Sequence, residues 1–76
     1  MNEEQVWQTI ALDLKRAANY LSANRVRQAN YYLEEAKRLY GTLRLSKNMR
    51  SIRSFIRFEG NPEEILLGSS LIGARI

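Results

Sequence analysis

The sequence predicts an all-α fold, a small bundle of three to four short helices in which helices 1 and 2 form an antiparallel hairpin. Apolar residues recur at helical spacing over two long stretches, and only a few residues separate these stretches. A strong helix-start motif follows near residue 61. Because the chain has 76 residues, we expect a single helical domain over residues 1–76.

The first two helices have the clearest patterns in the chain. Helix 1 is expected over about residues 3–22 and helix 2 over about residues 25–40, and each carries one continuous apolar face. The apolar face of helix 2 contains Val26, Ala29, Leu33, Ala36 and Tyr40. Because so short a connection leaves no room for a crossover, the two helices are expected to pack antiparallel.

This predicted hairpin resembles one tetratricopeptide-type repeat. The resemblance rests on Ala29, Leu33 and Ala36 in the second helix and on Tyr20 in the first, over about 25 residues. Asp13 stands where that repeat carries a large apolar residue, and the sequence has no second copy. Since such arrays need about three repeats, we interpret the resemblance as shared hairpin geometry and not as family membership.

The second half of the chain predicts two further helices. Helix 3 is expected over about residues 46–58. Asn61 followed by Pro62 and Glu64 combines an N-cap residue, a proline at the first helical position and a glutamate that reaches back to the cap. Helix 4 is therefore expected from residue 62, with a Gly-Ser-Ser run ending it and residues 69–76 forming an apolar tail.

The predicted core collects the apolar faces of all four helices. Its expected members are Val6, Trp7, Ile10, Leu14, Leu21, Val26, Ala29, Leu33, Ala36, Tyr40, Met49, Ile52, Ile56 and Leu66. A domain of this size buries only about 60% of the surface that its unfolded chain exposes. Self-association is a common way for such a domain to bury more apolar surface.

Composition excludes several kinds of site. The chain has no cysteine and no histidine, which excludes disulfides, thiolate or imidazole zinc ligands and histidine-based catalysis. The remaining carboxylates stand at helix starts or on charged faces, and Asp13 is expected to pair with a neighbouring arginine rather than act as a base. We therefore predict no enzyme activity, no cofactor, no metal and no small-molecule substrate.

The N-terminal residues are acidic and do not resemble a secretory signal, and no apolar run is long enough to span a membrane. These observations predict an intracellular, cytoplasmic protein.

Positive charge is concentrated in one block of the chain. The net charge is +4, and residues 36–58 contain seven basic side chains and no acidic one. The candidate residues for contact with a polyanion or a partner are Arg44, Lys47, Arg50, Arg53 and Arg57. If helix 3 forms as expected, Arg50, Arg53 and Arg57 share one face of it. That face is either solvated surface, a nucleic-acid contact, or a contact to an acidic protein or anionic membrane.

A second set of residues is a candidate protein interface. Tyr31, Arg27 and Arg38 share the polar face of helix 2, Leu12 lies on the polar side of helix 1, and Leu67, Leu71 and Ile72 belong to the apolar C-terminal segment. The alternative for each of these residues is that it belongs to ordinary solvated surface or to the core. We therefore predict a small non-enzymatic protein-interaction or regulatory module that self-associates as a homodimer or binds a protein partner. The alternative is a nucleic-acid-binding protein that uses the basic face of helix 3.

Overall fold

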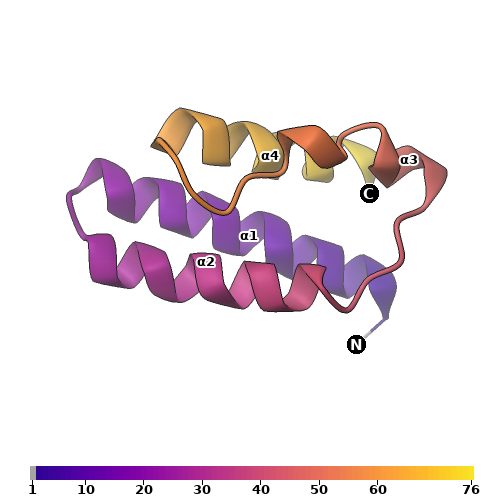
Figure 1. The fold of residues 1–76 in the computed structure, drawn as a ribbon, viewed down its shortest axis with the longest axis horizontal. Coiled ribbons are helices and arrows are strands. Elements are labelled where there is room, and N and C mark those ends of the chain that lie inside the picture. The colour runs from indigo at the N-terminus through magenta and orange to yellow at the C-terminus, as the bar shows by residue number, and fades with distance from the viewer. Residues whose placement is uncertain (1) are drawn as a thin grey trace.

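The computed structural model describes residues 2–76, apart from the side chain of Asn48, and confirms an all-α fold. Met1, which belongs to the predicted domain, lies outside the described residues. The elements in chain order are α1 (Glu3–Ser22), α2 (Val26–Tyr40), α3 (Lys47–Arg50), the 3₁₀ turn η1 (Arg53–Phe55) and α4 (Pro62–Arg75). Figure 1 shows the three longer helices side by side, with α3 at the end that also holds both termini.

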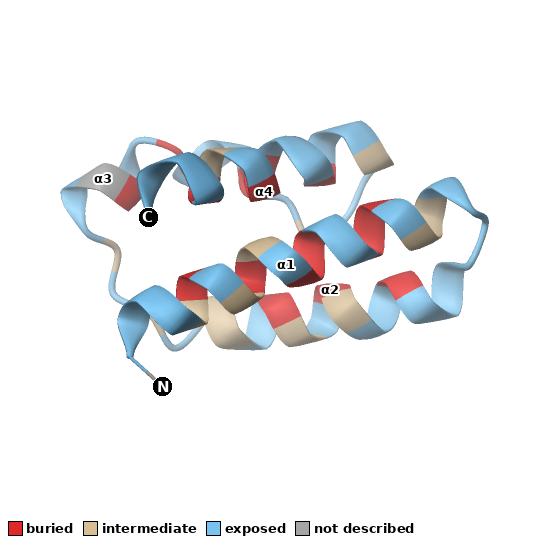
Figure 2. Ribbon diagram, turned by 180° about the vertical axis from the view of Figure 1, so that it is seen from behind, coloured by how far each residue is buried: buried red, intermediate tan, exposed pale blue. Residues whose placement is uncertain are grey.

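Helix α1 is the centre of the bundle. It packs along α2 on one side and along α4 on the other, whereas α2 and α4 barely touch each other. The Cα atoms accordingly span 35 × 22 × 15 Å, a flattened shape. Figure 2 shows that the buried residues of α1 and α2 lie where the two helices face each other. Both outer helices therefore depend on α1 for their buried surface.

The predicted antiparallel hairpin of α1 and α2 is confirmed. A reciprocal capping box begins α1, because Asn2 Oδ1 accepts from the Gln5 backbone N–H at 2.8 Å and Gln5 Oε1 accepts from Asn2 N–H at 3.1 Å. The turn between the helices contains Asn24 at φ 60°, a left-handed conformation that asparagine tolerates better than most residues. This turn reverses the chain within three residues.

Three aromatic rings join the elements toward the end of the hairpin where α1 begins and α2 ends. The Trp7 ring of α1 meets the Tyr40 ring of α2 edge-on, with centroids 6.0 Å apart. The Tyr40 ring also meets Phe58, in the connector to α4, at 5.3 Å. Such edge-to-face pairs contribute about 0.5–1.5 kcal/mol each beyond the area that they bury. The connector after η1 is thereby attached to the hairpin.

The prediction of one continuous helix over residues 46–58 is wrong. Helix α3 ends at Arg50, η1 follows a two-residue turn, and Ile56 is extended at φ −84° and ψ 111°. Residues 51–58, SIRSFIRF, contain two serines, two β-branched isoleucines and two phenylalanines, all weaker helix formers than alanine or leucine. Breaking the helix allows Met49, Ile52 and Ile56 all to be buried.

The prediction that residues 69–76 form a separate tail is also wrong. Helix α4 begins at Pro62 and continues through the Gly-Ser-Ser run to Arg75. Tertiary packing overrides the weak propensity of that run, because Ser69 is buried and its Oγ donates to the Ala11 carbonyl at 2.6 Å. Ile72, one turn later, is completely buried against the rest of the core.

Most predicted core residues are buried or half-buried, but two are not. Val26 is 55% exposed, because it lies in the first turn of α2, beside the hairpin turn where little of α1 remains to cover it. Leu66 is 41% exposed, and Ile65 takes its place in the core with no exposed surface. The predicted core residues Val6, Leu21 and Tyr40 are half-buried and pack against the core.

Candidate interaction surfaces

The basic surface is defined here as Arg44, Lys47, Arg50, Arg53 and Arg57, the five cationic side chains predicted to contact a partner. All five are exposed. Arg44 lies in the linker after α2, Lys47 and Arg50 lie on α3, Arg53 lies on η1, and Arg57 lies in the connector after η1. Arg50, Arg53 and Arg57 do not share one face of a helix as predicted, since no single helix runs through residues 46–58. Within residues 2–76, none of the five makes an ion pair or a side-chain hydrogen bond.

The backbone under the basic surface is held against α4. Phe55 O and Ile56 Cα would lie only 3.0 and 3.3 Å from a Cβ atom at Gly68, so the glycine permits a close approach that alanine would crowd. At the other end of the segment, Arg75 Nη1 donates to Ser51 Oγ at 2.7 Å. These contacts fix which side chains of residues 51–57 face inward and which face solvent.

Phe55 is a functional candidate that the sequence reasoning missed. It is absent from the predicted core and from the predicted contact residues, and in the structure it is 48% exposed. Its neighbours Ile52 and Ile56 are 2% and 8% exposed, so the segment turns those two side chains inward and leaves the phenylalanine outside. The run of weak helix formers in residues 51–58 was the only sequence signal for this exposure, because it disfavours a continuous helix over these residues.

The α4 outer face is defined here as Leu66, Leu67, Ser70, Gly73 and Ala74, the exposed residues on the side of α4 away from α1. Leu66 and Leu67 are 41% and 47% exposed. Residues 65–74 of α4 contain no charged side chain, and the acidic and basic residues of the helix stand only at its two ends. An exposed helix face normally carries charged or strongly polar residues, so this one is unusual for a surface in water.

Two glycines of α4 differ sharply in their surroundings. Gly68 is buried and required by the backbone of residues 55–57, whereas a Cβ atom at Gly73 would meet nothing within 4 Å. A glycine inside an exposed helix costs about 1 kcal/mol relative to alanine. Packing within the chain therefore does not explain why position 73 lacks a side chain.

The predicted interface residues of the C-terminal segment separate into three environments. Leu67 is exposed, Leu71 is half-buried, and Ile72 has no exposed surface. The prediction that Ile72 belongs to an interface is therefore wrong, because the continuation of α4 turns it into the core. Leu12 on α1 is 44% exposed and lies in a shallow depression with Gln5, Gln8 and Thr9.

Tyr31 lies on the outer side of α2, as do Arg27 and Arg38. Tyr31 is 66% exposed, and its ring meets the Tyr32 ring edge-on, with centroids 5.2 Å apart. Tyr32 in turn stacks on Tyr20 of α1 at 5.7 Å. Arg27 and Arg38 line the same shallow depression as Tyr31, together with two glutamates, so this face carries charges of both signs.

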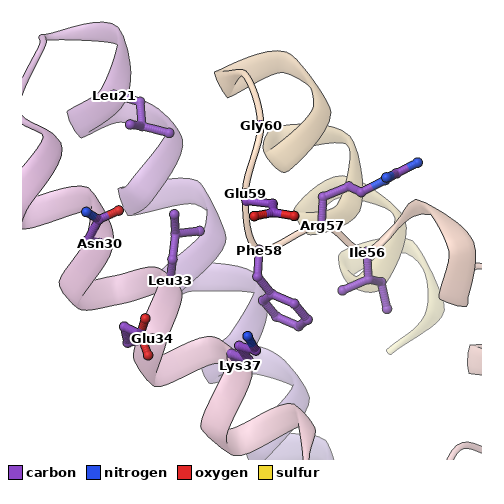
Figure 3. Close-up of a pocket in the computed structure, with 10 residues that line it drawn as sticks. All are labelled: Leu21, Asn30, Leu33, Glu34, Lys37, Ile56, Arg57, Phe58, Glu59 and Gly60. Atoms are coloured by element: carbon purple, nitrogen blue, oxygen red, sulfur yellow. The ribbon is translucent and has the colours of Figure 1, made fainter.

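A groove of about 560 Å³ runs between α2 and the connector that leads into α4. Figure 3 shows Glu34 and Lys37 on the α2 wall and Glu59 on the connector wall, with the Arg57 side chain directed away from the opening. Its lining thus mixes acidic, basic and apolar side chains. This arrangement presents no concentrated charge and no convergent set of reactive groups.

Asp13 is buried to 2% exposure on α1, and the expected pairing with an arginine is wrong. Its Oδ2 accepts no hydrogen bond within the described residues. The nearby Arg16 guanidinium instead lies 5.5 Å from the centre of the Tyr32 ring. Burial, together with the negative charge of Glu35 on α2, raises the pKa of the Asp13 carboxyl from its ordinary 3.8 to about 6, and the positive charge of Arg16 opposes both effects.

Comparison with known proteins adds no relative. No protein-family model, no curated protein and no solved structure matches the chain. None of the helices within residues 2–76 combines the length and apolar character needed to cross a membrane. In the same described residues, no three acidic side chains gather closely enough to hold a metal ion.

Proposed function

We propose that this protein is a small non-enzymatic interaction module that self-associates through the α4 outer face. The observation that supports the proposal best is the uncharged stretch of α4, which leaves Leu66 and Leu67 at 41% and 47% exposure in the single chain. Burying two such leucines against a partner removes apolar surface from water, and no charge has to be desolvated to do so.

A second copy of the chain is the partner that fits this face best. The protein carries a net charge of +4, so two copies repel each other weakly as they approach. The α4 outer face is uncharged, and two copies related by a twofold axis meet there without like-charge repulsion. Gly73 lies on this face, where a missing side chain lets two helix backbones approach closely.

The expected dimer is weak and reversible. A stable interface buries about 800 Å² on each partner, which is more than one face of a 14-residue helix supplies. We therefore expect a monomer–dimer equilibrium in the micromolar range rather than an obligate dimer. The core of the chain in the structure is closed without a partner, which agrees with a folded monomer.

Sedimentation velocity over a hundredfold range of protein concentration tests this proposal. Leu67→Glu places two carboxylates in the contact, and Gly73→Gln fills the space between the helices with a good helix former. Both variants should be monomeric at concentrations where the unmodified protein is dimeric. Val26→Glu is the matched control, because Val26 is 55% exposed on another helix and should leave the equilibrium unchanged.

Two results contradict the proposal. One is a protein that stays monomeric up to millimolar concentration. The other is a dimer that Leu67→Glu and Gly73→Gln leave intact, which would place the contact on a different surface. Circular dichroism of each variant at low concentration establishes that the monomer is still folded.

A further inference from the structure

We propose that the basic surface, together with the exposed ring of Phe55, binds single-stranded nucleic acid. This inference does not depend on self-association, because it uses α3, η1 and their flanks and not the α4 outer face. Two observations support it. The first is a group of cationic side chains without acidic partners in the described part of the chain, and the second is the exposed Phe55, which lies between Arg53 and Arg57 in the chain.

The charge is available to a ligand. The five cationic side chains of the basic surface are exposed and, among the residues that the structure describes, have no acidic partner. Four of the five are arginines, whose planar guanidinium groups donate two parallel hydrogen bonds to a phosphate. Residues 36–58 contain no acidic side chain, and although Glu59 shares a groove with Arg57 and Glu3 shares a depression with Arg44, within residues 2–76 neither carboxylate forms an ion pair with these arginines.

The aromatic ring is held in place by the packing behind it. Ile52 and Ile56, on either side of Phe55 in the chain, are buried, and the Phe55 carbonyl lies against Gly68. The ring is therefore turned to solvent on a backbone that is fixed from behind. Arg53 and Arg57 are each two residues away, so a base stacked on Phe55 has phosphates within reach of cations on both sides.

Single strands fit this surface better than duplexes. A duplex keeps its bases stacked on each other and offers no face to the phenylalanine ring. Reading a duplex through its major groove requires a longer helix or a β-ribbon, and α3 has four residues. A single strand has flexible, partly unstacked bases, and every base has a face that can stack on an aromatic ring.

An anionic membrane fits the surface less well. Membrane-surface binding needs an amphipathic helix whose apolar face is free to enter the lipid. In this segment Met49, Ile52 and Ile56 are buried in the core, so Phe55 is the one large apolar side chain that it presents to solvent. A single ring does not supply the apolar area that such a helix inserts.

Fluorescence polarisation with a labelled twenty-nucleotide oligothymidine tests the proposal on the full chain. We expect micromolar binding at 50 mM salt, and a slope of log affinity against log salt between about −2 and −3.5 for three to five contacted phosphates. Phe55→Ala should weaken binding by between about fivefold and a hundredfold, the usual loss when one stacking ring is removed. Phe55→Trp should bind as tightly as the unmodified protein, because it keeps an aromatic ring at this position.

Matched controls separate the site from general charge. Arg53→Gln and Arg57→Gln should each make the salt slope shallower by about 0.7, whereas Arg27→Gln, an exposed arginine on α2, should leave the slope unchanged. Val26→Ala controls for truncating an exposed apolar side chain. Circular dichroism confirms that each variant keeps its helical content.

Four results overturn the proposal. They are no binding at 50 mM salt, unchanged affinity in folded Phe55→Ala, tighter binding to a duplex of the same sequence, and binding to phosphatidylserine vesicles in the absence of any binding to the oligonucleotide. The last result would assign the basic surface to a lipid headgroup.

Discussion

Asp13→Asn should stabilise the protein at neutral pH, which is unusual for a change inside a core. The folded-state pKa of about 6 lies roughly two units above the ordinary value of 3.8, because the carboxylate is buried and the negative charge of Glu35 disfavours its ionised form. One pKa unit corresponds to about 1.4 kcal/mol. Ionised Asp13 therefore destabilises the fold by about 3 kcal/mol relative to the neutral acid, a large part of a small domain's total stability.

The sign follows from proton linkage. The folded state holds the proton of the Asp13 carboxyl more tightly than the unfolded state does. The favourable contribution of protonated Asp13 to the free energy of folding is therefore fully present below pH 3.8. It is lost as the pH rises through about 6 and stays constant above that. Asparagine has nearly the same shape and a similar helix propensity but does not ionise. The variant should therefore gain up to about 3 kcal/mol at pH 8 and little at pH 4.

Urea denaturation between pH 4 and 8, followed by circular dichroism and by the fluorescence of the single tryptophan, Trp7, measures this difference. Glu35→Gln should recover a smaller part of the stability at pH 8, because it removes a repulsion but not the burial. Glu34→Gln, its exposed neighbour, is the control. If the Asp13→Asn variant is less stable than the unmodified protein at pH 8, the argument is refuted, because the carboxylate would then have a stabilising hydrogen-bond or ion-pair partner.

The remaining predictions concern how α4 is held. Gly68→Ala should destabilise the fold by about 1–3 kcal/mol in thermal unfolding, because the new Cβ meets the backbone of Phe55 and Ile56 at 3.0 and 3.3 Å and overpacks the site; an unchanged melting temperature would contradict the close approach. Ser69→Ala should cost about 1 kcal/mol in urea titrations by removing the 2.6 Å hydrogen bond to the Ala11 carbonyl. A variant as stable as the unmodified protein would show that this bond contributes nothing net.

The two long helices of the hairpin were predictable because their patterns are local. Asn61 likewise marks the start of α4, since its Oδ1 accepts from the Glu64 backbone N–H at 2.9 Å, as an N-cap residue should. What the sequence did not reveal depends on contacts between distant residues. Periodicity alone does not decide which of Ile65, Leu66 and Leu67 faces inward, because all three are apolar. The packing of Gly68 and Ser69 against η1 and α1 sets that rotation.

The same reasoning applies to the two candidate surfaces. The cationic residues of the basic surface were identified from the sequence, because a block of unopposed charge is visible without a fold. Phe55 was not, because its exposure follows from the break after Arg50 and from the close approach at Gly68. Ile72 was wrongly placed at an interface because the helix was expected to stop before it.

Helix α4 links the two proposals through its two sides. Gly68, on one side, holds the backbone that presents Phe55, while Leu66 and Gly73 lie on the side away from α1. A partner on the α4 outer face therefore does not cover the basic surface, and each chain of a dimer keeps its own. Two weak sites on one particle bind a long strand more tightly than either site alone, because the second contact becomes intramolecular. If the chain self-associates through α4 as proposed, a second basic surface on the same particle would compensate for the small number of phosphates that one basic surface can reach.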